Sequence, residues 1–415
     1  MAKDRIQAPR GTFDVLPEDG LRRAALMRAT AELLGAAGYG PLETPIFESL
    51  ELFARGVGET TDIVQKEMFT FEDQGGRSLA LRPEGTAPVG RAYMEHGMHK
   101  LPQPVKLWYW GPFFRHEAPQ AGRFRQFTQI GAEAVGSDDP SLDAELILLL
   151  AELLDSAGAR SVRLRLSSLG TPETRRAYAD ELRAHLRGRE EQLSDDVVRR
   201  LERNPLRAFD SDHPGTQAAL EDAPRLLDRL NDDDAEHFAG VRSLLDDAGL
   251  AYELDGTLVR GLDYYTRTVF EFTSDALGAQ SALGGGGRYD GLIEQLGGQP
   301  TPGVGWAAGV ERILMASDAE PPAPDTVAFV ALDSGGSSRD AFRLLRGLRD
   351  GGVPAQMEQA GRSLKGQLKH ADRLGARWVV IVGDGELQLK DMRSGEQRAA
   401  AGLEEAVRAV TAGSP

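Results

Sequence analysis

Apolar residues recur every three to four positions in two long stretches of the chain, residues 16–40 and 141–158. This spacing gathers them on one face of a helix. The first stretch opens with Pro-Glu-Asp and stops at Gly38, a pattern typical of helix ends. The second begins at Ser141, which suits an N-cap, and ends in glycine. Both stretches are predicted to be helices.

Apolar and β-branched residues dominate five other stretches, which are predicted to be strands. They read SLALRPEG, VKLWYWGPFFRHE, RFRQFTQIGAEAVG, SVRLRLSSLG and LVRGLDYYTRTVFEF. A kink is expected at Gly111-Pro112, because proline cannot donate to a ladder. Residues 171–250 are charged and rich in Leu, Ala and Arg, and we interpret them as a mainly helical insertion. Farther along, β-structure is expected to resume at 258 and to run through SALGGGGRYDGL, with GGGGRYDG as a glycine-rich loop. Its four successive glycines predict that some group comes close to the backbone, and a flexible hairpin is the alternative. A helix is expected to follow in GWAAGVERILMA.

Residues 317–325 read SDAEPPAPD, a composition rich in proline and acid that favours a linker. Strand-like and helix-like segments alternate after it, which predicts a small α/β domain with a partly parallel sheet. We therefore expect a first domain at 1–320, the end of the linker at 321–325 and a second domain at 326–415. The fold class is α+β.

Composition narrows the class of protein. The chain has 415 residues, enough for two or three domains, and is 41% hydrophobic and 27% charged, as soluble globular proteins are. It has no apolar run of membrane-spanning length, so no membrane partner is expected. The absence of cysteine excludes disulfides and thiolate chemistry and fits a cytoplasmic protein. The net charge of −16 means that any nucleic-acid-binding face must be a local basic one.

One predicted strand carries an unusual row of polar groups. In RFRQFTQIGAE, residues two apart share a face, which joins Arg123, Arg125, Phe127, Gln129 and Glu133. Cations, an aromatic plate, an amide and an acid on one face suit ligand binding. The alternative is a solvated sheet face on which the charges pair with one another.

Two neighbouring stretches repeat this theme. Arg115 and Glu117 share a face at the end of the preceding strand, and LRPEGT places Arg82 and Glu84 together. Gly85 would let the backbone come close to a ligand. A plain turn with a surface ion pair is the alternative for LRPEGT.

The remaining motifs exclude several chemistries. GGGGRYDG does not fit a dinucleotide-binding fingerprint, and GRSLKGQ lacks the lysine of a phosphate-binding loop. No histidine spacing suits a metal and no serine-nucleophile motif is present. Three arginines in glycine-flanked contexts, Arg115, Arg260 and Arg312, favour phosphoryl chemistry, in which positioned cations stabilise the transition state.

Together these motifs identify a family. The sequence resembles histidyl-tRNA synthetase, a class II aminoacyl-tRNA synthetase, over essentially the whole chain. FFRHEAPQAGRFRQFTQIGAE resembles motif 2 of the class, GVGWAAGVERIL motif 3, and GYGPLETPIFES the dimer-forming motif 1. LVRGLDYYTRTVFEF and ALGGGGRYDGL resemble the two histidine-specific motifs. The resemblance implies a six-stranded antiparallel catalytic sheet with flanking helices and a helical insertion, a C-terminal α/β anticodon-binding domain, and a homodimer.

The resemblance also implies the reaction. L-Histidine and ATP would give histidyl-adenylate and pyrophosphate, and the acyl group would then pass to tRNA-His. Mg²⁺ would bridge the ATP phosphates and would not occupy a site made by protein ligands alone. The implied catalytic residues are Arg260 and Arg115. Residues implied in ATP binding are Arg115, Glu117, Arg123, Phe127 and Arg312. Residues implied in histidine binding are Glu84, Gly85, Thr86, Arg115, Gln129, Glu133, Arg260, Tyr264 and Tyr265.

Within this scheme, Glu84, Thr86 and Gln129 would hold the α-amino group, and Glu133 with the two tyrosines would hold the imidazole. Because Arg260 and Tyr265 differ in strand parity, residues 258–272 cannot form one regular strand that aims both at the substrate. We expect Arg260 on a loop or bulge, with the strand starting near Tyr264.

A binding protein is the alternative to an enzyme. The regulatory subunit of ATP phosphoribosyltransferase resembles the same catalytic domain and senses histidine without aminoacylation. It lacks the anticodon-binding domain, whereas this chain continues through residues 326–415 and keeps Arg115, Arg260 and Arg312. These features favour the enzyme.

Overall fold

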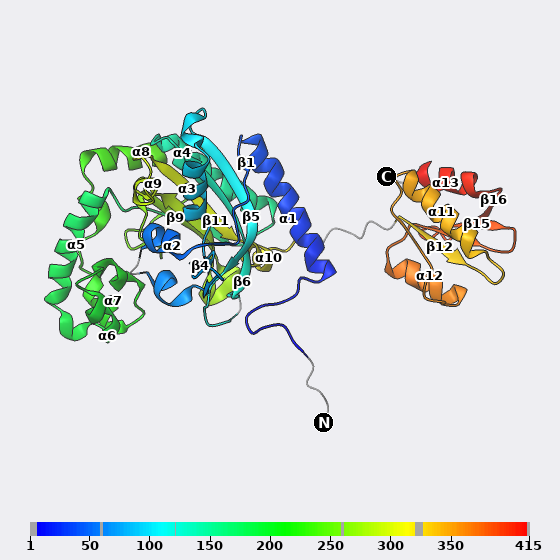
Figure 1. The fold of residues 1–415 in the computed structure, drawn as a ribbon, viewed down its shortest axis with the longest axis horizontal. Helices are drawn as coiled ribbons and strands as arrows, with labels where there is room; N and C mark the ends of the chain where they lie inside the picture. Colours follow the sequence, from blue (N-terminus) through cyan, green and yellow to red (C-terminus); the bar gives the residue numbers. More distant parts are fainter. Residues whose placement is uncertain (1–5, 59–60, 121, 259–260, 320–326, 413–415) are drawn as a thin grey trace, which may run out of the picture. The chain divides into compact units, whose positions relative to one another are not determined.

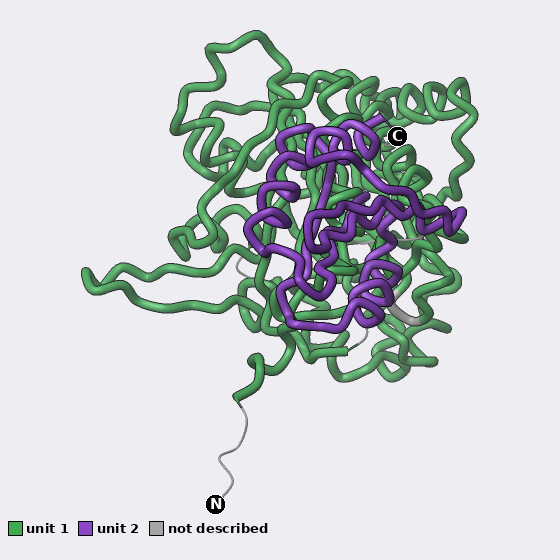
Figure 2. The backbone as a smooth tube through the Cα atoms, turned by 90° about the vertical axis from the view of Figure 1, so that its right-hand side faces the viewer, with its two compact units in different colours: residues 1–320 green, residues 321–415 purple. Residues whose placement is uncertain are grey.

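The computed structural model describes residues 6–58, 61–120, 122–258, 261–319 and 327–412. The chain divides into two compact units, Met1–Glu320 and Pro321–Pro415, which Figure 2 shows in different colours. The helices and strands of both units appear in Figure 1.

The first unit holds ten α-helices among its described residues. They are α1 (Pro17–Ala36), α2 (Leu50–Val57), α3 (Thr86–Glu95), α4 (Pro140–Ser156), α5 (Pro172–Arg187), α6 (Asp195–Arg200), α7 (Pro214–Leu220), α8 (Asp232–Asp247), α9 (Leu292–Gln295) and α10 (Val310–Ala316). Helix α1 begins at the predicted Pro-Glu-Asp and is followed by Gly38 at a φ of 84°. Helix α4 is capped by the carboxylate of Asp139, which accepts from the Ser141 backbone, so the predicted Ser141 cap is wrong. The carboxylate also suits the positive end of the helix dipole.

Eleven strands form two sheets in the same unit. They are β1 (Gly40–Pro41), β2 (Phe47–Ser49), β3 (Thr70–Glu72), β4 (Ser78–Leu81), β5 (Val105–Phe114), β6 (Gln126–Val135), β7 (Val162–Ser168), β8 (Glu253–Leu254), β9 (Thr266–Ser274), β10 (Ala282–Arg288) and β11 (Gly303–Gly309). The large sheet has the order β1-β5-β6-β11-β10-β9-β7-β8, and the small one β2-β4-β3.

The six central strands of the large sheet are antiparallel throughout, as the fold class requires. Two-residue strands extend the sheet by a parallel pairing at each edge, β1 on β5 and β8 on β7. The expected six antiparallel strands are therefore present, but the whole sheet has eight strands and is mixed at its edges.

Strand β5 runs without a break through Gly111-Pro112, so the predicted kink is wrong. The backbone of Pro112 faces away from β6, and its carbonyl accepts from Arg82 Nε at 2.9 Å. The next outward residue, Phe114, donates its N–H to the Arg82 carbonyl at 3.0 Å. Strand β1 pairs only with Leu107 and Trp108, so no described strand pairs with β5 on this side of Pro112. The missing N–H of Pro112 therefore removes no hydrogen bond from the sheet.

The four glycines of GGGGRYDG lie in strand β10, which confirms the β-structure predicted through SALGGGGRYDGL, whereas the loop predicted at the glycines is wrong. Gly284, Gly286 and Gly287 are needed because the neighbouring strands come too close for a side chain. A Cβ on Gly286 would lie 1.9 Å from the Gly305 carbonyl oxygen, and one on Gly287 would lie 2.4 Å from that of Thr268. The predicted helix in GWAAGVERILMA is likewise half strand, since GWAAG belongs to β11 and helix α10 starts at Val310.

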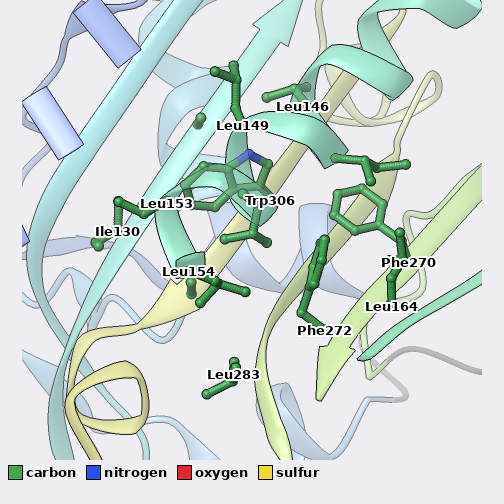
Figure 3. Close-up of a cluster of buried hydrophobic side chains, with 14 of the residues drawn as sticks. Ile130, Leu146, Leu149, Leu153, Leu154, Leu164, Phe270, Phe272, Leu283 and Trp306 are labelled. Atoms are coloured by element: carbon green, nitrogen blue, oxygen red, sulfur yellow. The ribbon is translucent and has the colours of Figure 1, made fainter. Parts of the chain in front are cut away.

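The main core lies between the sheet and helix α4. Trp306 of β11 is buried at its centre, among leucines of α4 and the phenylalanines Phe270 and Phe272 of β9 (Figure 3). Residues 171–250 contain helices α5 to α8 and no strand among their described residues, and they form a second core with Tyr178 and Leu182. Helix α8 returns to pack on α4.

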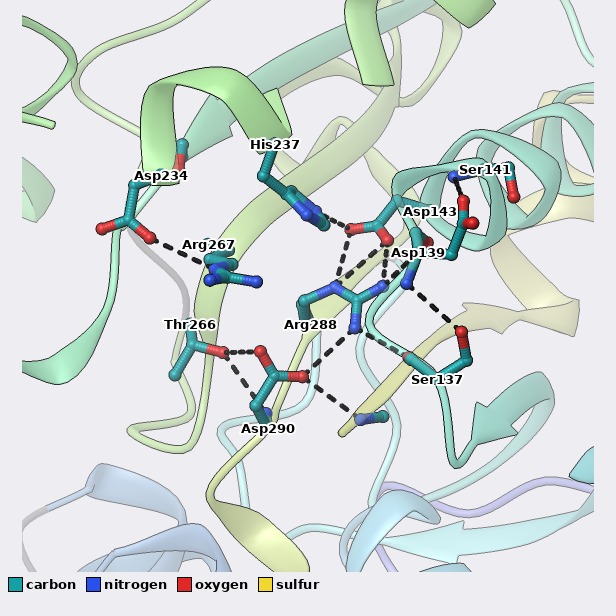
Figure 4. A network of polar contacts seen from close by, with 12 residues as sticks. Ser137, Asp139, Ser141, Asp143, Asp234, His237, Thr266, Arg267, Arg288 and Asp290 are labelled. Atoms are coloured by element: carbon teal, nitrogen blue, oxygen red, sulfur yellow. Dashed lines mark hydrogen bonds and ion pairs between the residues drawn. The ribbon is translucent and has the colours of Figure 1, made fainter. Parts of the chain in front are cut away.

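A buried ionic network ties strand β10 to these two helices (Figure 4). The Arg288 guanidinium and the Asp143 carboxylate of α4 are both fully buried and paired, and Arg288 also contacts Asp290 at 3.2 Å. His237 of α8 contacts Asp143 at 3.4 Å. Although burial acts in the opposite direction, the His237 bond and the Arg288 charge hold the pKa of Asp143 below its usual value. A buried charge of this kind needs all its partners.

Replacing His237 with leucine is expected to lower the free energy of unfolding by about 2 kcal/mol, because Asp143 loses a hydrogen bond inside the protein. Differential scanning calorimetry should show this as a fall of a few degrees in Tm. The exposed His99 provides the matched control. If His237→Leu and His99→Leu have the same Tm, His237 does not support the network.

The second unit is a small α/β domain. Its strands are β12 (Ala328–Leu332), β13 (Ala355–Met357), β14 (Trp378–Val382), β15 (Leu387–Asp391) and β16 (Gln397–Ala400), in the order β13-β12-β14-β15-β16. Strands β13, β12 and β14 are parallel and the β15–β16 hairpin is antiparallel, which confirms the partly parallel sheet. Helices α11 (Ser338–Asp350), α12 (Leu364–Arg373) and α13 (Leu403–Ala412) pack on it.

Candidate active site

A polar cleft of about 230 Å³ opens over strands β6, β10 and β11. It brings together predicted residues from four distant parts of the chain. The predicted residues that line it are Glu84, Gly85, Thr86, Arg115, Glu117, Arg123, Phe127, Gln129, Tyr264, Tyr265 and Arg312. Glu133 is fully buried and hydrogen-bonds to Thr86, one of these lining residues. Arg260 lies outside the described residues.

The segment before β9 is not strand. Residues 261–265 have irregular backbone, and β9 starts at Thr266, two residues after the predicted start at Tyr264. The two tyrosines therefore lie on the approach to the strand. Both are buried, their ring centroids are 4.7 Å apart, and both line the cleft.

Glu84 fixes the start of helix α3. Its carboxylate accepts from the backbone N–H groups of Thr86 at 2.7 Å and Ala87 at 3.0 Å, and from the Tyr264 hydroxyl at 3.3 Å. Burial raises the pKa of Glu84 above its usual value, although the backbone bonds oppose this. Glu84 thus joins the helix that carries Thr86 to the segment that carries Tyr264.

Glu133 on β6 is surrounded by hydroxyl groups. It accepts from Tyr289 at 2.7 Å, from Thr86 at 2.9 Å and from Tyr109 at 3.4 Å. Burial raises the pKa of Glu133 to about 8, even though these donors favour the charged form. Glu133 can therefore gain or lose a proton near neutral pH.

The glycines around this acid make room for the protein itself. A Cβ on Gly85 would lie 2.4 Å from the Tyr109 ring, and one on Gly131 2.1 Å from it. A Cβ on Gly305 would lie 1.7 Å from the Glu133 carboxylate. Gly85 thus permits a close approach by Tyr109, whereas the approach of a ligand to this backbone stays a prediction.

Arginines cover the other end of the cleft. Arg115 is fixed by a bond from its Nε to the Pro83 carbonyl at 3.0 Å and lies 5.5 Å from the Phe127 ring centroid. Arg312 is fixed by bonds to the Gly122 and Ala282 carbonyls at 2.9 and 2.8 Å. Burial and the nearby charges of Arg123 and Arg115 lower the pKa of Arg312. The charges of Arg115, Arg123 and Arg312 repel one another, and a polyanionic ligand would relieve this repulsion.

The polar face predicted from parity is only partly correct. Strand β6 starts at Gln126, so parity does not apply to the residues before it. Arg125 binds the carbonyls of Glu117 and Arg10, while Phe124, which strand alternation would put on the opposite face from Arg125, lines the cleft. On the strand itself, Gln129 lines the cleft, and its buried Oε1 has no hydrogen-bond partner within the described part of the chain.

Sequence reasoning missed two tyrosines, Tyr289 and Tyr109. Tyr289 is in the quoted GGGGRYDG, but its partner Glu133 lies two strands away, across β11. Tyr109 pairs in register with Gly131. A glycine opposite a large aromatic in a predicted strand pair was the available signal.

No group of three or more acidic or histidine side chains with metal-binding geometry occurs in the described ranges. Among those same residues, no helix combines the length and apolarity that a membrane crossing requires.

Comparison with known proteins matches both units. The family profile of histidyl-tRNA synthetase matches residues 11–313, and that of the anticodon binding domain residues 327–412. The chain is 48% identical to the histidine–tRNA ligase of Rubrobacter xylanophilus over 95% of this chain and 96% of that one. It is 49% identical to the ligase of Streptomyces avermitilis, with the same coverage.

Solved structures agree. Apo histidyl-tRNA synthetase of S. aureus has a TM-score of 0.82 and 36% identity, covering 98% of this chain and 100% of that one. A Bacillus halodurans protein described as an ATP phosphoribosyltransferase regulatory subunit/histidyl-tRNA synthetase shares the fold, with a TM-score of 0.66 at 23% identity. The chain belongs to the histidyl-tRNA synthetase family.

Proposed function

We propose that the protein ligates L-histidine to tRNA-His in two steps with ATP. The histidine carboxylate attacks the α-phosphorus, forming histidyl-adenylate and releasing pyrophosphate. A terminal hydroxyl of the tRNA then attacks the acyl carbon and releases AMP. The first step needs no protein base, because the carboxylate is already ionised at neutral pH. The observation that carries the proposal is one cleft that joins an arginine cluster to a buried acid–tyrosine pocket.

The arginine end would hold ATP. Arg115 would contact the α-phosphate and the substrate carboxylate, and Arg123 and Arg312 the outer phosphates, where developing negative charge is stabilised. Phe127 would stack on adenine, and Glu117 would contact the nucleotide. Mg²⁺ would neutralise the phosphates and would be held mainly by their oxygens. Arg260 remains a proposed second catalytic cation.

The acid–tyrosine end would hold histidine. The buried Gln129 Oε1 is an acceptor suited to the α-ammonium group, beside Glu84 and Thr86. Glu133 would receive one imidazole nitrogen and a tyrosine hydroxyl the other, which satisfies both. An amino acid with an apolar side chain of similar shape to histidine would leave the polar groups of this pocket without hydrogen-bond partners.

Partners follow from the same proposal. The second unit would bind the tRNA anticodon, and the exposed cations Lys365, Lys369 and Arg373 on α12 offer it a basic face. On α11, by contrast, Arg343 and Arg346 pair with acids of their own helix. Exposed Phe47 and Phe71 on the small sheet support a homodimer through motif 1. The site of action would be the cytoplasm.

Purified protein is expected to catalyse histidine-dependent exchange of pyrophosphate into ATP, and to charge tRNA-His. Binding of histidine with no exchange would instead identify the sensing paralogue. The control is exchange with the other amino acids, which should remain at background because the pocket's polar groups would be unpaired.

A further inference from the structure

The segment Leu262–Tyr265 is held in place from outside the catalytic sheet. It precedes β9 and has no strand neighbour, so its backbone groups need other partners. On one side, the Asp263 N–H donates to the Val57 carbonyl at the end of α2, at 3.2 Å. Gly58 leaves room for this approach, since a Cβ there would lie 2.9 Å from the Asp263 carboxylate.

On the other side the partner is an arginine of the helical insertion. Arg175 of α5 donates from Nη1 to the Tyr265 carbonyl at 2.8 Å and to the Asp263 carbonyl at 3.4 Å. Two carbonyls on one guanidinium nitrogen fix the backbone on both sides of Tyr264. Burial lowers the pKa of Arg175, so its charge is kept inside the protein at a cost.

The start of helix α5, which carries Arg175, is fixed by hydrogen bonds to its neighbours. The first turn of α5 is tied to Asp234 of α8, whose carboxylate accepts from the Thr171 N–H and the Thr174 hydroxyl, each at 2.8 Å. The same carboxylate accepts from Arg267 Nε of β9 at 3.2 Å. The insertion is therefore anchored to β9 only two residues beyond Tyr265.

The segment also separates two clefts. Leu262 lines the active-site cleft, and it lines a second cleft of about 400 Å³ in which Arg175 lies. Behind Leu262, the side chains of Tyr264 and Tyr265 enter the pocket assigned to histidine. A shift of the segment Leu262–Tyr265 would therefore move both tyrosines.

We propose that Arg175 is a positioning residue for histidine recognition: from the insertion, it holds the backbone of Asp263–Tyr265 and so orients Tyr264 and Tyr265 toward the amino acid. The inference rests on the proposed function for the identity of the ligand. It predicts that a helix remote from the catalytic sheet controls the affinity for histidine but not for ATP, because Arg115, Arg123 and Arg312, the arginines proposed to hold ATP, lie on other elements.

The test compares Arg175→Ala with wild type in pyrophosphate exchange and in calorimetric titration with histidine. The KM and Kd for histidine are expected to rise about tenfold, as two bonds to a charged donor are lost. The KM for ATP should stay within about twofold and kcat should change less than the histidine KM. Arg176→Ala is the control, since Arg176 is exposed and bonds within its own helix to the Pro172 carbonyl.

Arg175→Lys keeps the charge but not the guanidinium geometry, and an intermediate histidine KM is expected. Should Arg175→Ala fail to fold, this variant carries the test. An unchanged histidine Kd in a folded Arg175 variant, or equal losses of ATP and histidine affinity, would overturn the proposal. Wild-type protein without exchange activity would overturn the proposed function instead. The histidine titrations would still test whether Arg175 controls the affinity for histidine.

Discussion

Replacing Arg115 with alanine is expected to lower kcat for histidine-dependent pyrophosphate exchange by about 10²–10³-fold, the usual loss when one preorganised donor to a developing oxyanion is removed. Arg115 is preorganised because its Nε binds the Pro83 carbonyl. Its Nη1 lies 3.9 Å from the Glu117 carboxylate, which is too long for a hydrogen bond, so this end of the guanidinium can turn to a ligand. In the proposed reaction, the negative charge that Arg115 would meet grows on the oxygens of the crowded α-phosphate. Its loss should therefore lower kcat more than it raises the KM for ATP.

Arg125 provides the matched control for this change. It belongs to the same strand–loop region, but its guanidinium binds the carbonyls of Glu117 and Arg10 and is not among the groups lining the cleft. Arg125→Ala should keep kcat within about threefold, since the bonds that are lost run to backbone carbonyls and not to a group proposed to contact the substrates. A rise in the ATP KM with unchanged kcat in Arg115→Ala would mean that Arg115 only binds the nucleotide.

The sequence predicted the two ends of the cleft with unequal success, for a physical reason. The arginine end is carried by side chains in loops and at strand and helix starts, where polar residues stand out against an apolar pattern. The Glu133 pocket depends on neighbours across the sheet: Tyr289, which directly follows β10, and Tyr109 of β5 both reach the acid. Such contacts depend on the order and register of the strands, which could not be predicted from this single sequence.

The glycines show the same limit. Four in succession predicted that something must come close to the backbone, which is correct, but the approaching groups are the backbones of β9 and β11. Local propensity argues for a loop there, and tertiary pairing overrides it. In LVRGLDYYTRTVFEF the parity conflict did predict irregular backbone before the strand, because alternation is a local property. It could not predict that Arg175, some ninety residues earlier, would hold that backbone.

Replacing Glu133 with glutamine is expected to lower kcat/KM for histidine by about 10²-fold at neutral pH and to change its pH profile. In the complex proposed above, the Glu133–imidazole pair is assigned one titratable proton, as imidazolium with carboxylate or as imidazole with carboxylic acid. Free histidine loses its imidazole proton near pH 6.5, and Glu133 keeps its proton up to a pKa of about 8. The free partners together hold the correct number of protons only between these values, so wild-type kcat/KM should be bell-shaped in pH.

The upper limb of that profile belongs to Glu133, so it should disappear in Glu133→Gln while the lower limb, which belongs to the substrate, remains. Tyr289→Phe sharpens the assignment. The Tyr289 hydroxyl donates to Glu133 at 2.7 Å and stabilises the carboxylate, so its removal should raise the pKa of Glu133 and move the upper limb to higher pH. An upper limb that persists in Glu133→Gln would have to come from another group, and Glu133 would then not be the residue that exchanges a proton with the imidazole.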